Sequence, residues 1–280
     1  MAYRTRAAMA RGIVRPVEAL ADLGEQLRFY VAALAGVPHS LNRYRKEVAR
    51  LLAQVSFGTG ALAVIGGTIG VMISLSLFTG AVVGIQGYSA LNEIGTAPLT
   101  GFISAYFNTR EIAPLIAGLA LSATVGCGFT AQLGAMRINE EIDALEVMSI
   151  PSLPYLVTCR LIAGFLAVIP LYVIGLLTSY FGSRFVTVHI YGQSAGTYDH
   201  YFWLFLPPGD IVLSFVKVLI FSIAVVLIHC YYGYTARGGP AGVGVAVGRA
   251  VRLSIVTINL LDFFISLAVW GSTTTVHIAG

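Results

Sequence analysis

The sequence predicts an all-α integral membrane protein: an N-terminal interfacial helix, five transmembrane helices, and a short cytoplasmic helix between the second and third spans. Hydrophobic residues make up 57% of the 280 positions and charged residues only 11%, against about 45–50% and about 25% in soluble domains. The mean hydropathy is +0.82. Several apolar runs also exceed the roughly 20 residues that a helix needs to cross a bilayer. We therefore expect a chain that is solvated mainly by lipid.

Residues 1–54 are predicted to form a cytoplasmic segment that contains the interfacial helix. The basic start of the chain lacks the apolar core of a cleaved signal peptide before its first acidic residue, Glu18. Across 16–34, apolar residues recur at spacings of three or four, at Val17, Leu20, Leu23, Leu27, Val31 and Leu34. This stretch is too polar to cross the bilayer, so we expect it to lie on the cytoplasmic leaflet.

Five spans are expected within a membrane domain over 55–280. They cover about 55–86, 111–136, 154–182, 211–234 and 250–271. A polar turn with Glu93, Pro98 and Asn108 is expected before the second span. The outer loop over 184–209 is rich in aromatic residues, which indicates an interfacial aromatic belt or a docking surface for an outer partner.

Glycines are expected to allow close helix packing. In the first span, the pairs Gly66/Gly70 and Gly80/Gly84 have the spacing that lets two helices approach each other closely. The glycine-rich stretch 235–249 is expected to be a flexible turn. Its Gly244 and Gly248 are expected to contribute to helix packing as well.

The distribution of basic residues predicts the orientation. With the N-terminus inside, fourteen Lys and Arg residues lie on the inner side and only three on the outer side, namely Arg110, Arg184 and Lys217. Short cytoplasmic loops carry the excess of basic residues. The N-terminus is therefore expected in the cytoplasm and the C-terminus outside.

An acidic stretch between the second and third spans breaks this trend. Four carboxylates, those of Glu140, Glu141, Asp143 and Glu146, fall within seven residues. At 100° per residue, Ile138, Ile142, Leu145 and Met148 share one face of a helix over 138–148. Glu140, Asp143 and Glu146 lie on the other face. Prolines at 151 and 154 end it. We interpret it as a docking surface for a basic protein partner, the alternative being a solvated loop.

Two further charge pairs are candidate functional sites. Arg110 and Glu111 open the second span at the outer boundary, either as an exposed pair of little energetic worth or as a polar clamp for a lipid headgroup. Counting at about 1.5 Å per residue places Lys217 and Asp262 at the same depth of the membrane. A lone charge there costs at least about 2.5–3.5 kcal/mol, so we expect these two to pair or to share a polar pocket. The alternative is that Lys217 extends alone toward the membrane surface.

The sequence contains little that supports ATP hydrolysis, metal binding or catalysis by this chain. The sequence lacks a G-x-x-x-x-G-K-[ST] motif, so this chain is not a P-loop ATPase. The five histidines have no metal-ligand spacing and the three cysteines form no C-x-x-C motif. We expect no catalytic residue, no metal and no cofactor in this chain.

The stretch 122–164 carries a family resemblance. Its elements are "QLGAM" (132–136), "IDALEVM" (142–148) and "YLV-x-x-R" (155–160). Together with "TREIAPLIAGL" (109–119) and the glycine-rich run over 233–264, they resemble the MlaE/YrbE permeases, membrane subunits of ABC-type lipid transporters. The longer N-terminal segment is similar to the YrbE branch of actinobacterial Mce systems, in particular to a "B"-like subunit. Three positions depart from the family pattern: Thr124 replaces an arginine, Glu141 a glutamine and Cys159 a proline.

The resemblance implies a mechanism and partners. Two nonidentical permeases would pair in the inner membrane, so that the arginine missing at Thr124 could be kept by the partner. A cytoplasmic ABC ATPase dimer, which binds the ATP and Mg²⁺, would dock on the helix over 138–148. MCE-domain proteins would stand on the outer side, and the complex would move a fatty acid or related lipid, by preference inward.

Two alternatives remain open. A passive membrane scaffold could anchor the MCE proteins while the activity lies in a partner. A secondary transporter could use Lys217, Asp262 and Glu111 as an ion relay, although five spans allow no internal inverted repeat.

Overall fold

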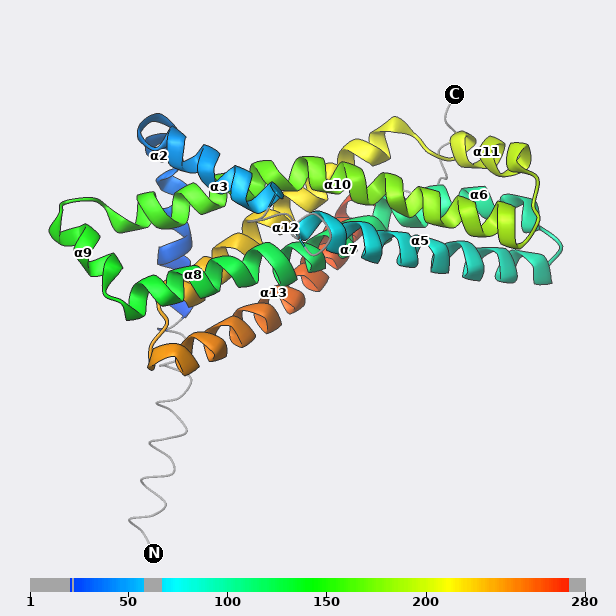
Figure 1. Ribbon diagram of the computed structural model, residues 1–280. Helices are drawn as coiled ribbons and strands as arrows, with labels where there is room; N and C mark the ends of the chain where they lie inside the picture. The colour runs from blue at the N-terminus through cyan, green and yellow to red at the C-terminus, as the bar shows by residue number, and fades with distance from the viewer. Residues whose placement is uncertain (1–20, 22, 58–66, 272–280) are drawn as a thin grey trace, which may run out of the picture.

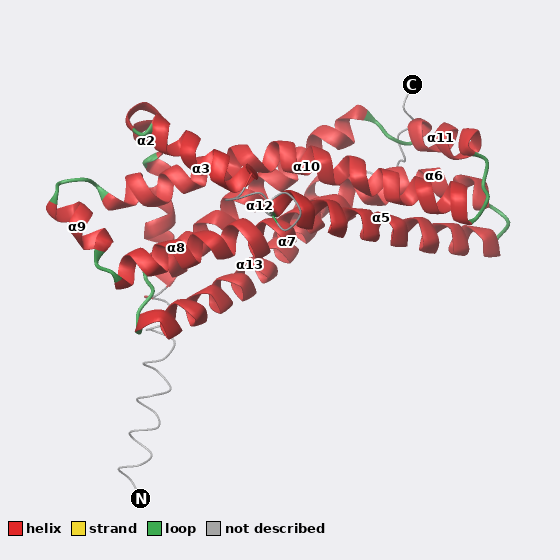
Figure 2. Cartoon of the chain, viewed as in Figure 1, coloured by secondary structure: helices red, strands yellow, loops and turns green. Residues whose placement is uncertain are grey.

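The computed structural model describes residues 21, 23–57 and 67–271, and it is a bundle of long helices (Figures 1 and 2). Within this part of the chain there is no strand. Five helical stretches are long and apolar enough to cross a membrane: Thr68–Glu93, Ala97–Ile138, Leu153–Ile190, Pro208–Tyr234 and Gly239–Trp270. The prediction of an all-α membrane protein with five spans is confirmed.

The N-terminal region packs across one end of the bundle. It comprises a helix over 23–35, then α2 (Val37–Arg43) and α3 (Arg45–Phe57). The ring of Phe29 lies 5.3 Å from that of Tyr231 near the end of the fourth span, and Thr158 Oγ1 donates a hydrogen bond of 3.0 Å to the Ala33 carbonyl. The opposite face exposes the apolar stripe, with Val31 66% exposed. Leu23, Leu27 and Leu34 share that face, whereas Val17 and Leu20 lie outside the described residues.

The first span is α5 (Thr68–Glu93). The predicted limits of 55–86 are wrong at both ends, because residues 55–57 belong to α3 and the helix extends to Glu93. Gly70 lies in the first turn of α5, and Gly66 lies outside the described residues.

The second span is a continuous helix of 42 residues with two π-helical segments. Its parts are η1 (Ala97–Leu99), α6 (Thr100–Ile103), η2 (Ser104–Ile112, π-helical), α7 (Ala113–Leu121), η3 (Ser122–Gly126, π-helical) and α8 (Cys127–Ile138). The prediction of a polar turn up to Asn108 is therefore wrong. Asn108 is buried in η2 and donates a hydrogen bond of 3.0 Å to Ser183 Oγ. A polar side chain with a protein partner can lie inside a bundle.

The remaining spans are also longer than predicted. The third comprises η4 (Leu153–Thr158), α10 (Cys159–Phe185) and η5 (Val186–Ile190); the fourth is α12 (Pro208–Tyr234) and the fifth is α13 (Gly239–Trp270). The stretch expected to be a glycine-rich turn is mostly the start of α13. Only a short link turns, and there Gly238 and Gly239 adopt left-handed φ angles of 90° and 69°, which glycine tolerates best.

The predicted outer loop over 184–209 is largely helical, since α10 and η5 continue to Ile190 and α11 covers Ala195–Leu204. Tyr198 and Phe202 are buried in a small core with Ala105 and Leu206, whereas Trp203 is 66% exposed. The aromatic residues thus serve partly as core and only partly as surface. Arg184 holds α11 by hydrogen bonds of 2.8 and 2.9 Å to Asp199, and these keep the pKa of Asp199 below its usual value.

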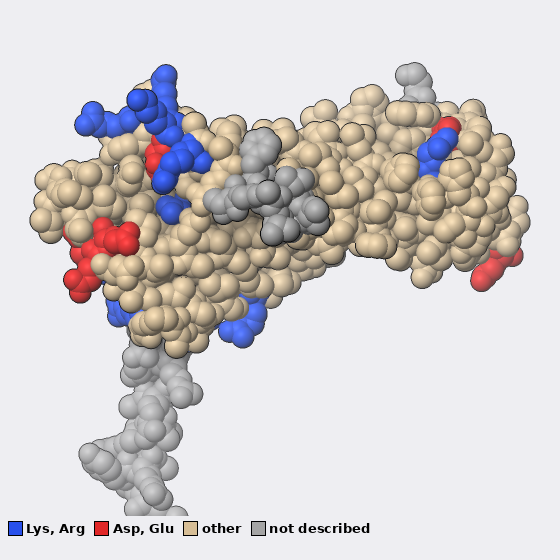
Figure 3. Space-filling model, in the orientation of Figure 1, with Lys and Arg blue, Asp and Glu red and all other residues tan. Residues whose placement is uncertain are grey.

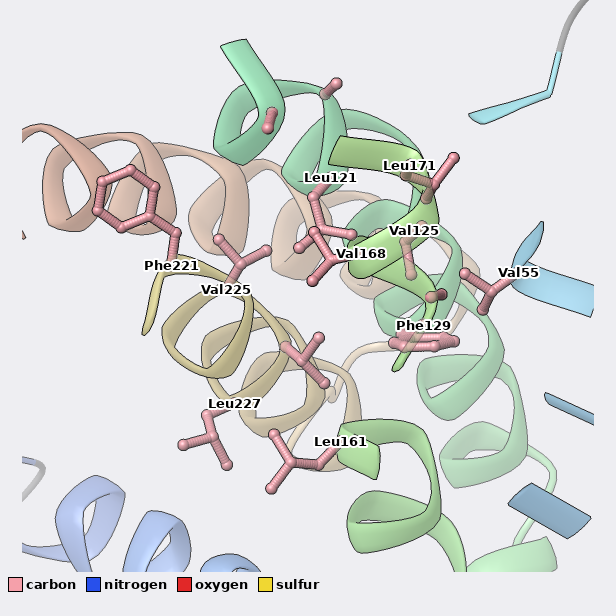
Figure 4. Close-up of a cluster of buried hydrophobic side chains, with 14 of the residues drawn as sticks. Val55, Leu121, Val125, Phe129, Leu161, Val168, Leu171, Phe221, Val225 and Leu227 are labelled. Carbon is pink, nitrogen blue, oxygen red and sulfur yellow. The ribbon is translucent and has the colours of Figure 1, made fainter. Parts of the chain in front are cut away.

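Two packing features hold the spans together. Apolar side chains of the second, third and fourth spans converge in one core, where Figure 4 shows Leu121 and Phe129 with Val168 and Val225. The first span instead packs closely on α10 through its glycines. A Cβ atom on Gly80 would lie 2.1 Å from the Ser179 carbonyl oxygen, and one on Gly84 would lie 2.8 Å from that of Ser183.

Gly244 and Gly248 do not pack in this way. A Cβ atom on either would meet nothing within 4 Å, so the predicted packing role is wrong for contacts among the described residues. Both glycines lie on a face of α13 that none of the described helices covers.

Charges gather at the ends of the molecule. In Figure 3, basic residues cluster around α2 and α3 and acidic residues on α9 (Glu141–Val147), while the middle of this face is almost uncharged. This distribution is that of a bundle whose middle lies in hydrocarbon.

Candidate functional site: an acidic terminal helix and a buried charge cluster

The acidic stretch forms α9, a helix of seven residues at one end of the bundle (Figure 1). The predicted helix began at Ile138, but that residue ends α8. Between the two helices, Glu140 takes a left-handed φ of 59°, and beyond α9 Ser149 does the same at 62°. Non-glycine residues rarely adopt this conformation. The α9 helix is thus set at a sharp angle between two tight turns.

The inner face of α9 is anchored to the bundle. Ile142 is fully buried and Leu145 is half-buried, as the predicted apolar face requires. Arg137 Nη1 lies 2.7 Å from Asp143 Oδ1, and Ser152 Oγ donates a hydrogen bond of 2.6 Å to Glu146 Oε1. Three of the four acids therefore bind the protein itself, since Glu141 also accepts a hydrogen bond of 3.3 Å from Asn139 Nδ2.

The outer face of α9 presents acids and two apolar side chains. All four acids are exposed, and Glu140 and Glu141 are the two without a bond to a residue beyond the turn that precedes α9. Met148 is 61% exposed, so its predicted place on the buried face is wrong, and its neighbour Val147 is 87% exposed. The helix ends before Met148, and the chain turns there. The surface is a mixture of carboxylates and apolar groups, which suits contact with a protein better than plain solvation.

A second feature is a cluster of five charged residues within the membrane part of the bundle, which we call the charge cluster: Arg110, Glu111, Asp210, Lys217 and Asp262. Lys217 has no exposed surface, and its Nζ lies 2.6 Å from Asp262 Oδ1 and 3.2 Å from Glu111 Oε2. It also donates to the Arg110 carbonyl at 2.8 Å and to Ser266 Oγ at 2.7 Å. The structure thus brings together the two charges expected at equal depth.

Arg110 does not form the expected pair with Glu111. Its guanidinium binds Asp210, with Nη2 2.6 Å and Nε 2.7 Å from Oδ2, and lies 4.1 Å from the centre of the Tyr106 ring. Trp270 Nε1 donates a hydrogen bond of 3.0 Å to the other oxygen of Asp210. Because neighbouring residues on a helix point in different directions, Arg110 and Glu111 reach different partners. The interpretation as an exposed pair is wrong for Arg110, which is only 6% exposed.

The charge cluster joins η2 of the second span to α12 and α13. Its two cations face three carboxylates, which leaves an excess of negative charge if all are ionised. A buried charge without a partner costs several kcal/mol, so the cluster fixes these helices relative to one another.

A cluster of hydrogen-bonded polar side chains surrounds His229, and it was not predicted from the sequence. The Nε2 atom lies 3.1 Å from Ser122 Oγ, and Nδ1 lies 2.8 Å from Thr130 Oγ1. Ser122 Oγ lies in turn 2.6 Å from Ser254 Oγ. These contacts connect three spans. The only signal in the sequence is a polar residue in the middle of each apolar run.

Thr124, the position where the resemblance led us to expect an arginine, lies on η3. Its hydroxyl donates a hydrogen bond of 2.7 Å to the Ala120 carbonyl. With Gln54 and Gln132 it lines a cavity of about 150 Å³. The Thr124 hydroxyl therefore bonds back to the preceding turn of its own helix, beside an open cavity.

Comparison with known proteins decides the family. A family model described as permease MlaE matches residues 57–268, which is most of the chain. This chain belongs to the MlaE permease family. It is similar to a "Probable ABC transporter permease protein" of Rickettsia bellii, 31% identical over 196 residues that cover 70% of this chain and 76% of the relative.

Two other relatives widen the range of this family. "Protein TRIGALACTOSYLDIACYLGLYCEROL 1, chloroplastic" of Arabidopsis thaliana is 31% identical, covering 71% of this chain and 57% of the relative. The "Intermembrane phospholipid transport system permease protein MlaE" of Haemophilus influenzae is 26% identical, covering 72% and 78%. As an MlaE family permease, the chain is a multi-pass transport subunit and not an enzyme. Both α9 and the charge cluster fall within the matched residues.

Proposed function

We propose that this chain is the transmembrane permease subunit of an ATP-driven lipid transporter of the Mce type. The name of the Haemophilus influenzae relative gives phospholipid transport as its activity, and the sequence is similar to the YrbE branch. The cargo is a lipid, by preference a fatty acid or a related molecule, and the direction is import into the inner membrane or cytoplasm.

The proposed assembly places partners at both ends of the bundle. A separate ABC ATPase dimer binds ATP and Mg²⁺ and docks on the cytoplasmic end, which carries α9. A second, nonidentical MlaE-type permease completes the membrane part, and MCE-domain proteins cover the outer end at α11. The N-terminus, with residues 1–54, then lies in the cytoplasm and the C-terminus outside. Arg110 and Glu111 belong to the outer half of the lipid path.

The shape of α9 is the observation that carries this proposal. The helix is fixed from below by Ile142, Asp143 and Glu146, and it exposes Glu140 and Glu141 beside Val147 and Met148. A rigid, protruding surface with acidic side chains around an apolar centre suits a basic groove on the ATPase. Movement of the ATPase would reach η4 and α8 directly, since α9 lies between them in the chain.

Charge reversal on α9 tests the proposal. We expect Glu140→Lys/Glu141→Lys to release the ATPase from the complex, because both side chains are exposed and the bond of Glu141 reaches only the neighbouring Asn139. The measurement is pull-down of the tagged chain from mild detergent, followed by mass spectrometry and an ATPase assay. Co-purification of an ATPase, a second permease and MCE proteins with the native chain, and loss of the ATPase alone from the variant, would support the proposal.

A matched control is available at the opposite end of the molecule. Glu93→Lys makes the same change of charge at the exposed end of α5, and it should leave the ATPase bound. If the α9 variant retains the ATPase, or if the native chain purifies alone, the coupling role is wrong. A complex that keeps its ATPase but supports no lipid movement would favour the passive scaffold.

A second candidate function rests on the charge cluster. Two cations and three carboxylates inside the bundle could relay a proton, as in an ion-coupled secondary transporter. We expect lipid transport to depend on ATP hydrolysis and to persist when the proton gradient is dissipated. Transport that stops on dissipation with ATP present, and that Asp262→Asn abolishes, would favour this alternative.

A further inference from the structure

Two cavities meet in one furrow between α12 and α13, with the helix over 23–35 along its side. The first cavity, of about 660 Å³, is lined by polar groups that include Arg237 and Arg249. The second, of about 580 Å³, is lined almost entirely by aliphatic side chains and by no charged residue among those described. Gln26 lines both cavities, so they adjoin.

The helical repeat explains why the furrow is continuous. On α13, the lining residues Ala246 and Arg249 of the polar part are followed by Leu253, Thr257 and Leu261 of the apolar part, at spacings of three or four. Such residues share one face of a helix. From Arg249 to Leu261 the face runs about 18 Å at 1.5 Å per residue, close to the roughly 15 Å that one leaflet contributes to the hydrocarbon.

The third side of the furrow is the outward stripe of the helix over 23–35. Leu27 and Val31 are 61% and 66% exposed and both line the apolar cavity. This explains why apolar residues recur on the face of that helix turned away from the core, where they gain nothing from packing on the protein.

The electrostatics of the polar part favour an anion. Arg237 and Arg249 are exposed, and neither forms an ion pair with another described residue. Glu25 is the single acid among the residues that line this cavity. Basic pockets beside the apolar surface of membrane helices suit anionic lipid headgroups.

We propose that this furrow binds an anionic phospholipid of the leaflet next to α9. The phosphate lies between Arg237 and Arg249, and an acyl chain follows the apolar part toward Leu261. The ligand is a resident lipid that joins the helix over 23–35 to the last two spans. The inference goes beyond the proposed function, because it needs neither an ATPase nor a cargo.

The dimensions favour an acyl chain over a helix of a partner protein. About 580 Å³ spread over the about 12 Å from Leu253 to Leu261 leaves a cross-section of about 50 Å², whereas a helix of about 10–12 Å diameter occupies about 80–110 Å². A partner helix would have to push the helix over 23–35 aside.

Native mass spectrometry of the full chain in detergent tests the headgroup site. Phosphatidylglycerol should bind with one tight site and phosphatidylcholine without one. We expect each of Arg237→Gln and Arg249→Gln to weaken phosphatidylglycerol binding about fivefold and the double variant about 25-fold. Arg252→Gln is the control, since Arg252 is exposed on the same helix but does not line the cavity. Equal binding of both lipids, unaffected by the arginine variants, would overturn the proposal.

A second pair of variants tests the acyl-chain path. Thr257→Trp fills the apolar cavity and should weaken phosphatidylglycerol binding, while Val256→Trp, on the neighbouring exposed face, should not. If soluble glycerol phosphate competes fully with phosphatidylglycerol, the site binds an anion without an acyl chain, and the proposal is overturned. A partner protein that co-purifies with the native chain and is lost on Thr257→Trp would also overturn it.

Discussion

Lys217 is buried without any exposed surface in the middle of an apolar helix. An ammonium group there is tolerated because Glu111, Ser266 and the Arg110 carbonyl accept its hydrogen bonds. The carboxylates of Asp262 and Glu111 neutralise its charge. Removing one member of a buried pair leaves the other charge without compensation, which costs more than the pair contributes. Lys217 therefore holds η2, α12 and α13 together.

A double-mutant cycle measures this coupling. Lys217→Met should lower the free energy of unfolding in detergent by about 3–5 kcal/mol, because two carboxylates lose their cation. Asp262→Asn should cost less, since Glu111 remains with the lysine. We expect the double variant to cost less than the sum by about 1–3 kcal/mol. Lys46→Met is the control, because Lys46 is the other lysine of the chain and is exposed. Additive effects would contradict the pairing.

Contacts between residues could be predicted from the sequence only where the depth of each residue in the membrane could be counted along a span. Lys217 and Asp262 lie in unbroken apolar runs, so their heights were comparable and their contact could be predicted. Asp210 lies at the boundary of its span, and no count along the chain shows that Arg110 turns toward it. The His229 cluster was missed because a neutral polar residue within an apolar run has no characteristic spacing.

At the scale of elements, glycines of α5 let the first span approach α10. The Gly80 Cα faces the α10 backbone so closely that a methyl group has no room. Gly80→Ala should therefore separate the two helices and cost about 1–3 kcal/mol of stability, measured as a lower unfolding midpoint in detergent. Gly128→Ala is the matched control, since a Cβ atom there meets nothing within 4 Å. An unchanged midpoint for Gly80→Ala would mean that the contact is loose.

The number and order of the spans could be predicted, but their ends could not. Hydropathy marks where a helix is apolar, whereas η2 continues the second span with polar residues that find partners on other helices. Asn108 reaches Ser183, and Thr109 contacts the Tyr180 hydroxyl at 2.5 Å. Similarly, the first residues of α13 are rich in glycine and are nevertheless helical, with Val243 packed close to Gly134 of α8.

For the whole molecule, the orientation in the membrane is the prediction with the widest consequence. A cysteine introduced as Glu141→Cys on α9 should react with a membrane-impermeant maleimide only in inverted vesicles. One introduced as His200→Cys on α11 should react only in intact cells. Both variants are made in a Cys127→Ala background, since Cys159 and Cys230 are buried. The opposite pattern would reverse the topology and exclude a cytoplasmic ATPase from α9.

The two left-handed turns around α9 give this end of the molecule a mechanical property. Glu140 and Ser149 hold conformations that cost of order 1 kcal/mol or more each outside glycine, so few backbone conformations are open to either turn. Under the proposed coupling, a force on α9 would therefore displace α8 and η4 more than it would distort the turns. Glycine at both positions would relieve this cost and so stabilise the resting fold, but it would also make both turns flexible. An ATPase docked on α9 would then hydrolyse ATP with little movement of the spans.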